Sequence, residues 1–161
     1  RAGMSDRTLY FEDFAAGQQF ESTGRTITEA DLTMFAMLSG DWHPMHCDRE
    51  FAASTRFGQR VVHGALGIAF ATGFMHALGI FERSIIAMMD LREWQFKAPL
   101  KIGDTLRLVL SIVEVQPGRS GRSGRVRRRF ELINQEGAVV QRGESDALVK
   151  VRPQPEQETT T

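Results

Sequence analysis

The one long apolar run of the chain extends from Ala65 to Phe81. Its apolar residues lie on nearly every face of a helical turn, so the run predicts a buried helix over roughly 64–78. This helix is rich in glycine, although glycine costs about 1 kcal/mol relative to alanine inside a helix. We therefore expect the helix to be surrounded by other elements and to be approached closely by a curved sheet.

Regular alternation of apolar and polar residues indicates strands in the second half of the chain. The alternation is clear over 106–112 and 126–132, and a last long strand is expected over 139–151. Between the last two strands, the segment from Asn134 to Gly137 has the composition of a hairpin turn. The pattern predicts an α+β fold with one domain, in which an antiparallel β-sheet accompanies a long central α-helix.

The first part of the chain predicts shorter elements. A strand is expected over 18–25, and a helix is expected between Thr28, a suitable N-cap, and Gly40, a suitable C-terminal stop. Asp48 is a suitable N-cap for a short helix over 49–55.

Two polar clusters lie on either side of that short helix. In the first, Asp41, His43 and His46 bring a carboxylate and two imidazoles into six residues, and the proline between them restricts the shape of the loop. In the second, His63 and Gly64 begin the central helix. Acid–base groups followed by a glycine at a helix start are suited to binding a reacting carbonyl and moving protons near it.

Composition narrows the class of protein. The 161 residues suit one domain, and 42% hydrophobic with 25% charged residues is ordinary for a soluble globular protein. The formal net charge is zero, so no overall field favours a nucleic-acid or membrane partner. The single cysteine, Cys47, fits a reducing compartment and is expected to be a small buried residue. No apolar signal segment is visible near the N-terminus, and we expect a cytoplasmic protein.

Three divisions of the chain are expected. Residues 1–9 form a leader, of which 1–3 are a remnant of cloning, residues 10–152 form the domain, and residues 153–161 form a disordered tail with almost no apolar side chains to bury.

At this point three strings of residues become informative together: SGDWHPMHCD, FAASTRFGQRVVHGAL and FKAPLKIGDTL. They resemble the MaoC-like branch of the hot-dog-fold proteins, the (R)-specific enoyl-CoA hydratases. The family signature runs Asp-x-Asn-Pro-x-His, continues with Asp two residues later, and ends in a His-Gly that begins the central helix. The likeness extends over about 10–151, and it departs from the signature at His43, where the family has Asn.

The resemblance implies a single hot-dog fold, a homodimer, and reversible hydration of trans-2-enoyl-CoA to (R)-3-hydroxyacyl-CoA. Coenzyme A would be part of the substrate, and no metal or redox cofactor is expected. Asp41 and His46 would hold and activate a water molecule, and the Gly64 N–H would receive the thioester oxygen. The further residues placed around the substrate are His43, His63, Thr72 and Met75.

Each of these residues also has a plainer interpretation. Asp41 alone would cap the loop, and His46 alone would be a structural histidine, but their joint spacing favours catalysis. His63 is expected to be mainly structural, because the resemblance uses only the amide of its neighbour. For His43, support of the loop and tuning of the Asp–His pair are equally open. For Thr72 and Met75 the plain expectation is core packing.

Three other functions stay open. The same chemistry could act on an acyl carrier protein, whose acidic surface would suit the six arginines of 118–129. That segment could instead contact the coenzyme A phosphates or simply be a solvated strand face. An acyl-CoA thioesterase of this fold would carry a carboxylate on the central helix, and 64–78 contains none. A non-catalytic acyl-CoA-binding protein is the last alternative. The carboxylates and imidazoles of 41–48 match no zinc-binding spacing, so no metal site is expected.

Overall fold

The structure is a computed structural model that describes residues 7–154. The expected cloning remnant at 1–3 and most of the expected disordered tail therefore lie outside the described residues. The described end of the leader contacts the domain, because the Leu9 N–H donates to Ile80 O at 2.8 Å.

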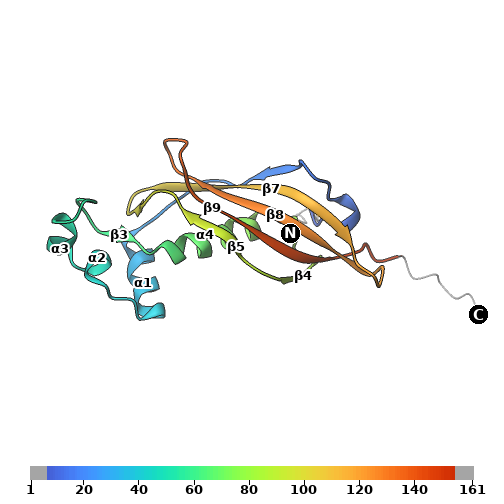
Figure 1. Cartoon of the computed structure of the whole chain (residues 1–161), viewed down its shortest axis with the longest axis horizontal. Helices are drawn as coiled ribbons and strands as arrows, with labels where there is room; N and C mark the ends of the chain where they lie inside the picture. The colour runs from blue at the N-terminus through green and yellow to red at the C-terminus, as the bar shows by residue number, and fades with distance from the viewer. Residues whose placement is uncertain (1–6, 155–161) are drawn as a thin grey trace, which may run out of the picture.

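A seven-stranded antiparallel sheet forms most of the molecule (Figure 1). Its centre is a run of three long strands: β7 (Thr105–Pro117), β8 (Ser123–Ile133) and β9 (Val139–Lys150). Two short strands, β1 (Gln19–Glu21) and β2 (Arg25–Thr26), pair with β7. Two others, β4 (Ile85–Met88) and β5 (Arg92–Phe96), pair with β9. The alternation predicted these long strands correctly, whereas the expected single strand over 18–25 is divided in two.

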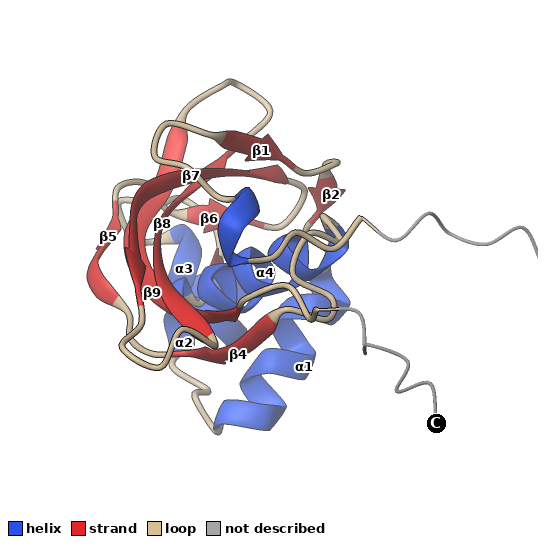
Figure 2. Cartoon of the chain, turned by 90° about the vertical axis from the view of Figure 1, so that its right-hand side faces the viewer, coloured by secondary structure: helices blue, strands red, loops and turns tan. Residues whose placement is uncertain are grey.

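The long helix α4 (Gly64–Ala77) lies inside the curve of this sheet, as Figure 2 shows. Phe70, Ala71 and Phe74 of the helix are buried in one core with the inward residues of β7, such as Leu108 and Leu110. A sheet wrapped around one central helix is the hot-dog fold, and the prediction of an α+β hot-dog domain is confirmed. None of the helices in the described part of the chain is long and apolar enough to cross a membrane.

The glycines of α4 have more than one explanation. A Cβ at Gly67 would collide with the Gln141 side chain of β9, so the sheet does approach the helix closely there, as predicted. Gly73, in contrast, has nothing within 4 Å of the Cβ position. The expectation that the helix is surrounded was wrong on one side, because Ala65, Ala69 and Gly73 form an exposed stripe. The sheet curves around only part of the helix.

A group of short helices lies beyond one end of the sheet (Figure 1). The first, α1 (Glu29–Ser39), begins with a reciprocal capping box between Thr28 and Asp31 and ends at Gly40, whose φ is +75°. Both ends therefore agree with the prediction. Asp48 caps α3 (Arg49–Ala53) by accepting from the Phe51 N–H at 2.9 Å, again as predicted.

Other small elements were not predicted. The loop expected around Pro44 contains a one-turn helix, α2 (Pro44–Cys47), with proline at its first position. A two-stranded sheet joins β3 (Val61–Val62) to β6 (Leu100–Lys101), and a 3₁₀ turn, η1, covers Phe11–Asp13. The β3–β6 sheet fixes the segment that leads into α4.

Arg128 has an unusual place for a charged residue, because its side chain is fully buried on the helix side of β8. Its guanidinium donates to Ser145 Oγ at 3.0 Å and to Met75 Sδ at 2.8 Å, and it lies 5.2 Å from the centroid of the Phe130 ring. No carboxylate of the described residues pairs with it, and burial lowers its pKa to about 10. The buried charge is thus held by weak partners.

Because the Arg128 pKa is lower in the folded than in the unfolded chain, the charged guanidinium destabilises the folded state at neutral pH. This destabilisation diminishes only as pH rises through 10, where the folded chain loses the guanidinium proton. We expect Arg128→Met to leave the free energy of unfolding unchanged or to raise it by about 1–3 kcal/mol. Arg128→Ala, which leaves a cavity, should lower it by about 2–4 kcal/mol. Urea unfolding at pH 7 measures both, and a clear loss of stability in Arg128→Met would contradict this view of the buried charge.

Candidate active site

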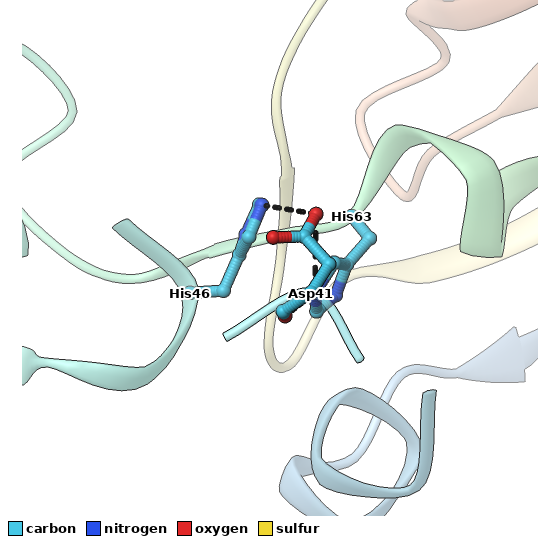
Figure 3. A group of neighbouring side chains, drawn as sticks. All are labelled: Asp41, His46 and His63. Atoms are coloured by element: carbon cyan, nitrogen blue, oxygen red, sulfur yellow. Dashed lines mark hydrogen bonds and ion pairs between the residues drawn. The ribbon is translucent and has the colours of Figure 1, made fainter. Parts of the chain in front are cut away.

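Three titratable side chains from separate segments meet beside the start of α4 (Figure 3). Asp41 follows α1, His46 lies in α2, and His63 directly precedes α4. Asp41 Oδ2 lies 3.8 Å from His46 Nε2 and 3.9 Å from His63 Nε2. These separations are longer than a direct hydrogen bond, so neither imidazole is bonded directly to the carboxylate, and a small polar molecule beside the gap between Asp41 Oδ2 and His46 Nε2 can bind both.

The two oxygens of Asp41 have different surroundings. Oδ1 accepts from the His43 N–H at 3.2 Å and so supports the loop, as the plainer interpretation of Asp41 suggested. Oδ2 is the oxygen that faces the two imidazoles. The Asp41 side chain is 52% exposed, which leaves this oxygen open to solvent and to a ligand.

His46 is buried, and one hydrogen bond determines its tautomer. The Val61 carbonyl, which can only accept, lies 2.7 Å from Nδ1, so Nδ1 carries the hydrogen. In the neutral ring Nε2 then has a free lone pair, and it faces the Asp41 carboxylate. His46 is therefore arranged as a proton acceptor with a fixed orientation.

His63 has the opposite arrangement. Its Nε2 lies 2.9 Å from the Asp41 carbonyl oxygen, so Nε2 is the nitrogen that carries the hydrogen and donates. The residue is only 3% exposed, and its ring stacks on that of His46 with centroids 3.8 Å apart. The two imidazoles are thus close neighbours, but only His46 offers a lone pair toward Asp41.

The start of α4 supplies hydrogen-bond donors to the same place. His63 is the N-cap residue and makes no side-chain cap, and in the described part of the chain the Gly64 N–H has no acceptor. Gly64 and His46 both line a pocket of about 540 Å³. The Phe96 ring lies 2.8 Å from the Cβ position of Gly64, so a larger residue there would push the ring aside. A helix start with a free amide is a favourable site for developing negative charge.

The family model of the MaoC like domain matches residues 13–132 of this chain. The chain belongs to the MaoC-like dehydratase family. Its enzyme class is accordingly that of the hydro-lyases, as the names of its relatives indicate.

Two relatives and one solved structure illustrate the likeness. A Rhodospirillum rubrum protein named (R)-specific enoyl-CoA hydratase is 32% identical over 143 residues, which cover 89% of this chain and 93% of the relative. Protein MaoC of Klebsiella aerogenes is 40% identical over 102 residues, or 63% of this chain, and these span 30% of that longer relative. A crystal structure titled monoamine oxidase regulatory protein, from Archaeoglobus fulgidus, is 34% identical with a TM-score of 0.83, covering 91% of this chain and 97% of that one.

The other residues that the sequence predicted to surround a substrate lie at different distances from this site. His43 is exposed beside it, and its Nδ1 accepts from the Met45 N–H at 3.1 Å as the N-cap of α2. Thr72 and Met75 lie two to three turns further along α4, outside the lining of the pocket that contains Gly64. Thr72 Oγ1 donates to the Ala69 carbonyl, and Met75 contacts Arg128.

Gln141 of β9 is a residue of the site that the sequence did not reveal. It is buried, its Nε2 donates to Gly64 O at 3.0 Å, and its Oε1 accepts from Trp94 Nε1 at 3.0 Å. These bonds hold the start of α4 against the sheet and so fix the direction of the Gly64 amide. In the sequence, a glutamine among the mostly apolar residues of an expected buried strand is the feature that could have indicated a polar contact at this position.

Cys47 differs from its prediction as a buried residue. The structure places it at the surface, where its Sγ donates to the Trp42 carbonyl at 3.0 Å. Cys47 is the last residue of α2, one helical turn after the N-cap His43. Its Sγ therefore also reaches the His43 carbonyl, at 3.4 Å.

A metal is the alternative ligand for this cluster of one carboxylate and two imidazoles, whose ligand atoms all lie within 4.8 Å of one another. The stacked rings make a poor fit, because their planes are only 25° apart and their centroids are 3.8 Å apart. An imidazole lone pair lies in the ring plane, and a zinc ion about 2.0–2.1 Å from each nitrogen cannot lie close to both planes. His63 also lacks a lone pair at Nε2 and a partner for Nδ1.

Three of the six arginines of 118–129, those on the outer face of the sheet, are paired with carboxylates. Arg127 contacts Asp146 at 3.2 Å and Glu114 at 2.9 Å, and these acidic neighbours raise the pKa of Arg127. Arg129 contacts Glu144 at 2.8 Å. For the strand part of the segment, this arrangement favours the interpretation as a strand face with its own counter-charges.

Proposed function

We propose that this MaoC-like protein is an (R)-specific enoyl-CoA hydratase, which adds water reversibly to trans-2-enoyl-CoA to give (R)-3-hydroxyacyl-CoA. The observation that carries the proposal is the convergence of the Asp41 carboxylate and the free lone pair of His46 beside the uncapped start of α4. The named relatives support it, since they include hydratases and dehydratases of enoyl and hydroxyacyl thioesters.

The Asp–His pair would handle the water molecule. His46 Nε2 takes one proton from a water held against Asp41 Oδ2, while the hydroxyl oxygen bonds to the β-carbon of the substrate. The pair then delivers a proton to the α-carbon, so both parts of the water enter the product and the pair returns to its initial state. Dehydration is the same sequence in reverse.

The start of α4 would stabilise the charge that this addition creates. As the β-carbon accepts the hydroxyl, electron density moves to the thioester oxygen, which becomes enolate-like. Gly64 begins the helix and lines the pocket, and its N–H has no acceptor in the described residues. Removing one such donor from comparable sites costs roughly 3–4 kcal/mol in the activation barrier.

We propose that the reaction needs neither metal nor redox cofactor, because hydration requires only proton transfer and charge stabilisation, and the stacked imidazoles suit a metal poorly. A thioesterase is the weaker candidate, since α4 carries no carboxylate. A carrier-protein substrate is also less favoured, because Arg125, Arg127 and Arg129, half of the arginines expected to attract an acidic protein, are paired within the chain.

The proposed acyl contacts set a condition on chain length. At 1.5 Å per residue, Thr72 lies about 12 Å and Met75 about 16 Å beyond Gly64 along α4. Only a long acyl group whose thioester carbonyl lies at Gly64 would reach these two residues. Short substrates would be bound mainly by the pocket around His46 and by the coenzyme A portion.

The protein is proposed to act as a homodimer. The edge formed by β4 and β5 has no further neighbour in the described residues, and it exposes five large apolar side chains: Ile86, Met88, Met89, Leu91 and Phe96. On α1, Met34 and Met37 are each 68% exposed and Leu38 is 85% exposed. An open sheet edge with exposed apolar residues is typical of a surface that pairs with a second copy.

The proposed roles of Asp41 and His46 predict the effect of substitutions on catalysis. Wild type should consume crotonyl-CoA with loss of the ultraviolet absorbance of the conjugated enoyl thioester. Asp41→Asn and His46→Ala should each lower kcat by roughly 10²–10⁴-fold, because each removes one partner in the proton transfers. His76→Gln, a change at an exposed histidine near the end of α4, should leave kcat unaltered.

Other outcomes of this assay separate the alternatives. Release of free coenzyme A thiol without loss of the double bond would indicate a thioesterase. Activity seen only with enoyl thioesters of an acyl carrier protein would show that the substrate is the carrier-protein thioester and not the coenzyme A thioester. Tight binding of enoyl-CoAs of short and long chain without any turnover would contradict the enzyme and support the binding protein.

The dimer proposal predicts a change in mass. Wild type should elute in size-exclusion chromatography with light scattering at twice the mass of one chain. The double variant Ile86→Lys/Met88→Lys should be a monomer, because two charges on an edge strand oppose pairing with another edge. Glu136→Lys, in the exposed β8–β9 turn, is the matched control and should stay dimeric. A monomeric wild type would refute the proposal.

A further inference from the structure

We infer that His63 is a positioning residue that orients both members of the catalytic pair, Asp41 through its backbone and His46 through its ring. This inference rests on the proposed hydratase function. It assigns to His63 neither acid–base chemistry nor contact with the substrate.

The bond from His63 Nε2 to Asp41 O connects two segments 22 residues apart in sequence. Asp41 has otherwise local hydrogen bonds: its N–H donates to Ser39 Oγ at 3.2 Å, and Oδ1 accepts from the His43 N–H at 3.2 Å. Asp41 is exposed, so these local bonds leave the loop free to move relative to α4. The His63 bond fixes the carbonyl of Asp41 to the start of that helix.

The stacked rings restrict His46 in a complementary way. The bond from His46 Nδ1 to Val61 O fixes one nitrogen but by itself leaves some freedom in the tilt of the ring plane. The face of His63, 3.8 Å away with a 25° angle between the planes, removes this remaining freedom. Phe35 of α1 packs against His63, with centroids 5.0 Å apart, and holds it in place. His46 Nε2 is thereby directed toward Asp41 Oδ2.

An imidazole is the side chain that meets both demands. Phenylalanine could supply the flat face but not the donor, and glutamine could supply the donor but not the face. His63 cannot also serve as the general base, because Nε2 carries the hydrogen that it donates, and Nδ1 is buried without a partner. Its side chain is not occupied in capping α4 either. Its hydrogen bond and its two ring contacts therefore go to Asp41, His46 and Phe35.

Two variants of His63 each remove one contact: His63→Phe removes the hydrogen bond to Asp41 O, and His63→Gln removes the ring stacked on His46. His63→Phe and His63→Gln should each lower kcat and kcat/KM together by about 10–100-fold, with KM within about twofold of wild type, because positioning matters most in the transition state. In an Asp41→Asn or His46→Ala background, adding His63→Phe should lower kcat by less than threefold, since the pair that His63 orients is already disabled. His76→Gln should behave as wild type in every background.

A second measurement does not depend on activity. Crystal structures of His63→Phe and His63→Gln should show the fold intact, with the Asp41 loop displaced in the first and the His46 ring turned in the second. If the kcat losses multiply in the double variants, or if the pair keeps its wild-type geometry, His63 acts independently and the inference is overturned. If wild type hydrates no enoyl thioester but the displacements occur, the positioning role stands and the proposed function fails.

Discussion

The close contact between α4 and the sheet at Gln141 determines where the start of α4 lies, and the site is built around that helix start. Because Gly67 has no side chain, the Gln141 amide reaches past it and donates to the Gly64 carbonyl while accepting from Trp94. The start of the helix is therefore held at a fixed distance from β9. The Gly64 amide and the His63 ring take their positions from that anchored helix start and from the β3–β6 sheet that leads into it.

The second constraint is the assignment of hydrogens on two neighbouring imidazoles. His46 and His63 lie at almost equal distances from the same carboxylate oxygen, so distance alone does not distinguish them. Their backbone acceptors do, because one ring donates from Nδ1 and the other from Nε2. One histidine is left with a lone pair facing Asp41 and the other with a role in orientation. Two carbonyl groups of the backbone thus decide which side chain can accept a proton.

The parts of the fold that could be predicted from sequence are those whose causes are local. The capping box of Thr28 with Asp31, the left-handed Gly40, and the β8–β9 turn at Gly137 each follow from a few adjacent residues. The exposed stripe of α4 could not be predicted in the same way, because an apolar helix face gives no sign of whether the same chain covers it.

The site was predictable in its residue types but not in its contacts. The spacing of Asp41, His46 and Gly64 indicated the chemistry, and the structure brings Asp41 and His46 together beside the helix that Gly64 begins. The bond from His63 to the Asp41 backbone and the contact of Gln141 with Gly64 join residues 22 and 77 positions apart. Such pairings depend on how the sheet curves around the helix, and single-sequence patterns do not carry that information.

The central claim is that water adds across the double bond of an enoyl thioester with defined stereochemistry, and product analysis in labelled water tests it most directly. Crotonyl-CoA would be incubated with the protein in H₂¹⁸O, and the thioester product would be examined by mass spectrometry and chiral chromatography. The account predicts an intact 3-hydroxybutyryl-CoA of (R) configuration with ¹⁸O on the hydroxyl-bearing carbon. Label in a free carboxylate together with released coenzyme A, or a hydroxyl group of (S) configuration, would contradict it.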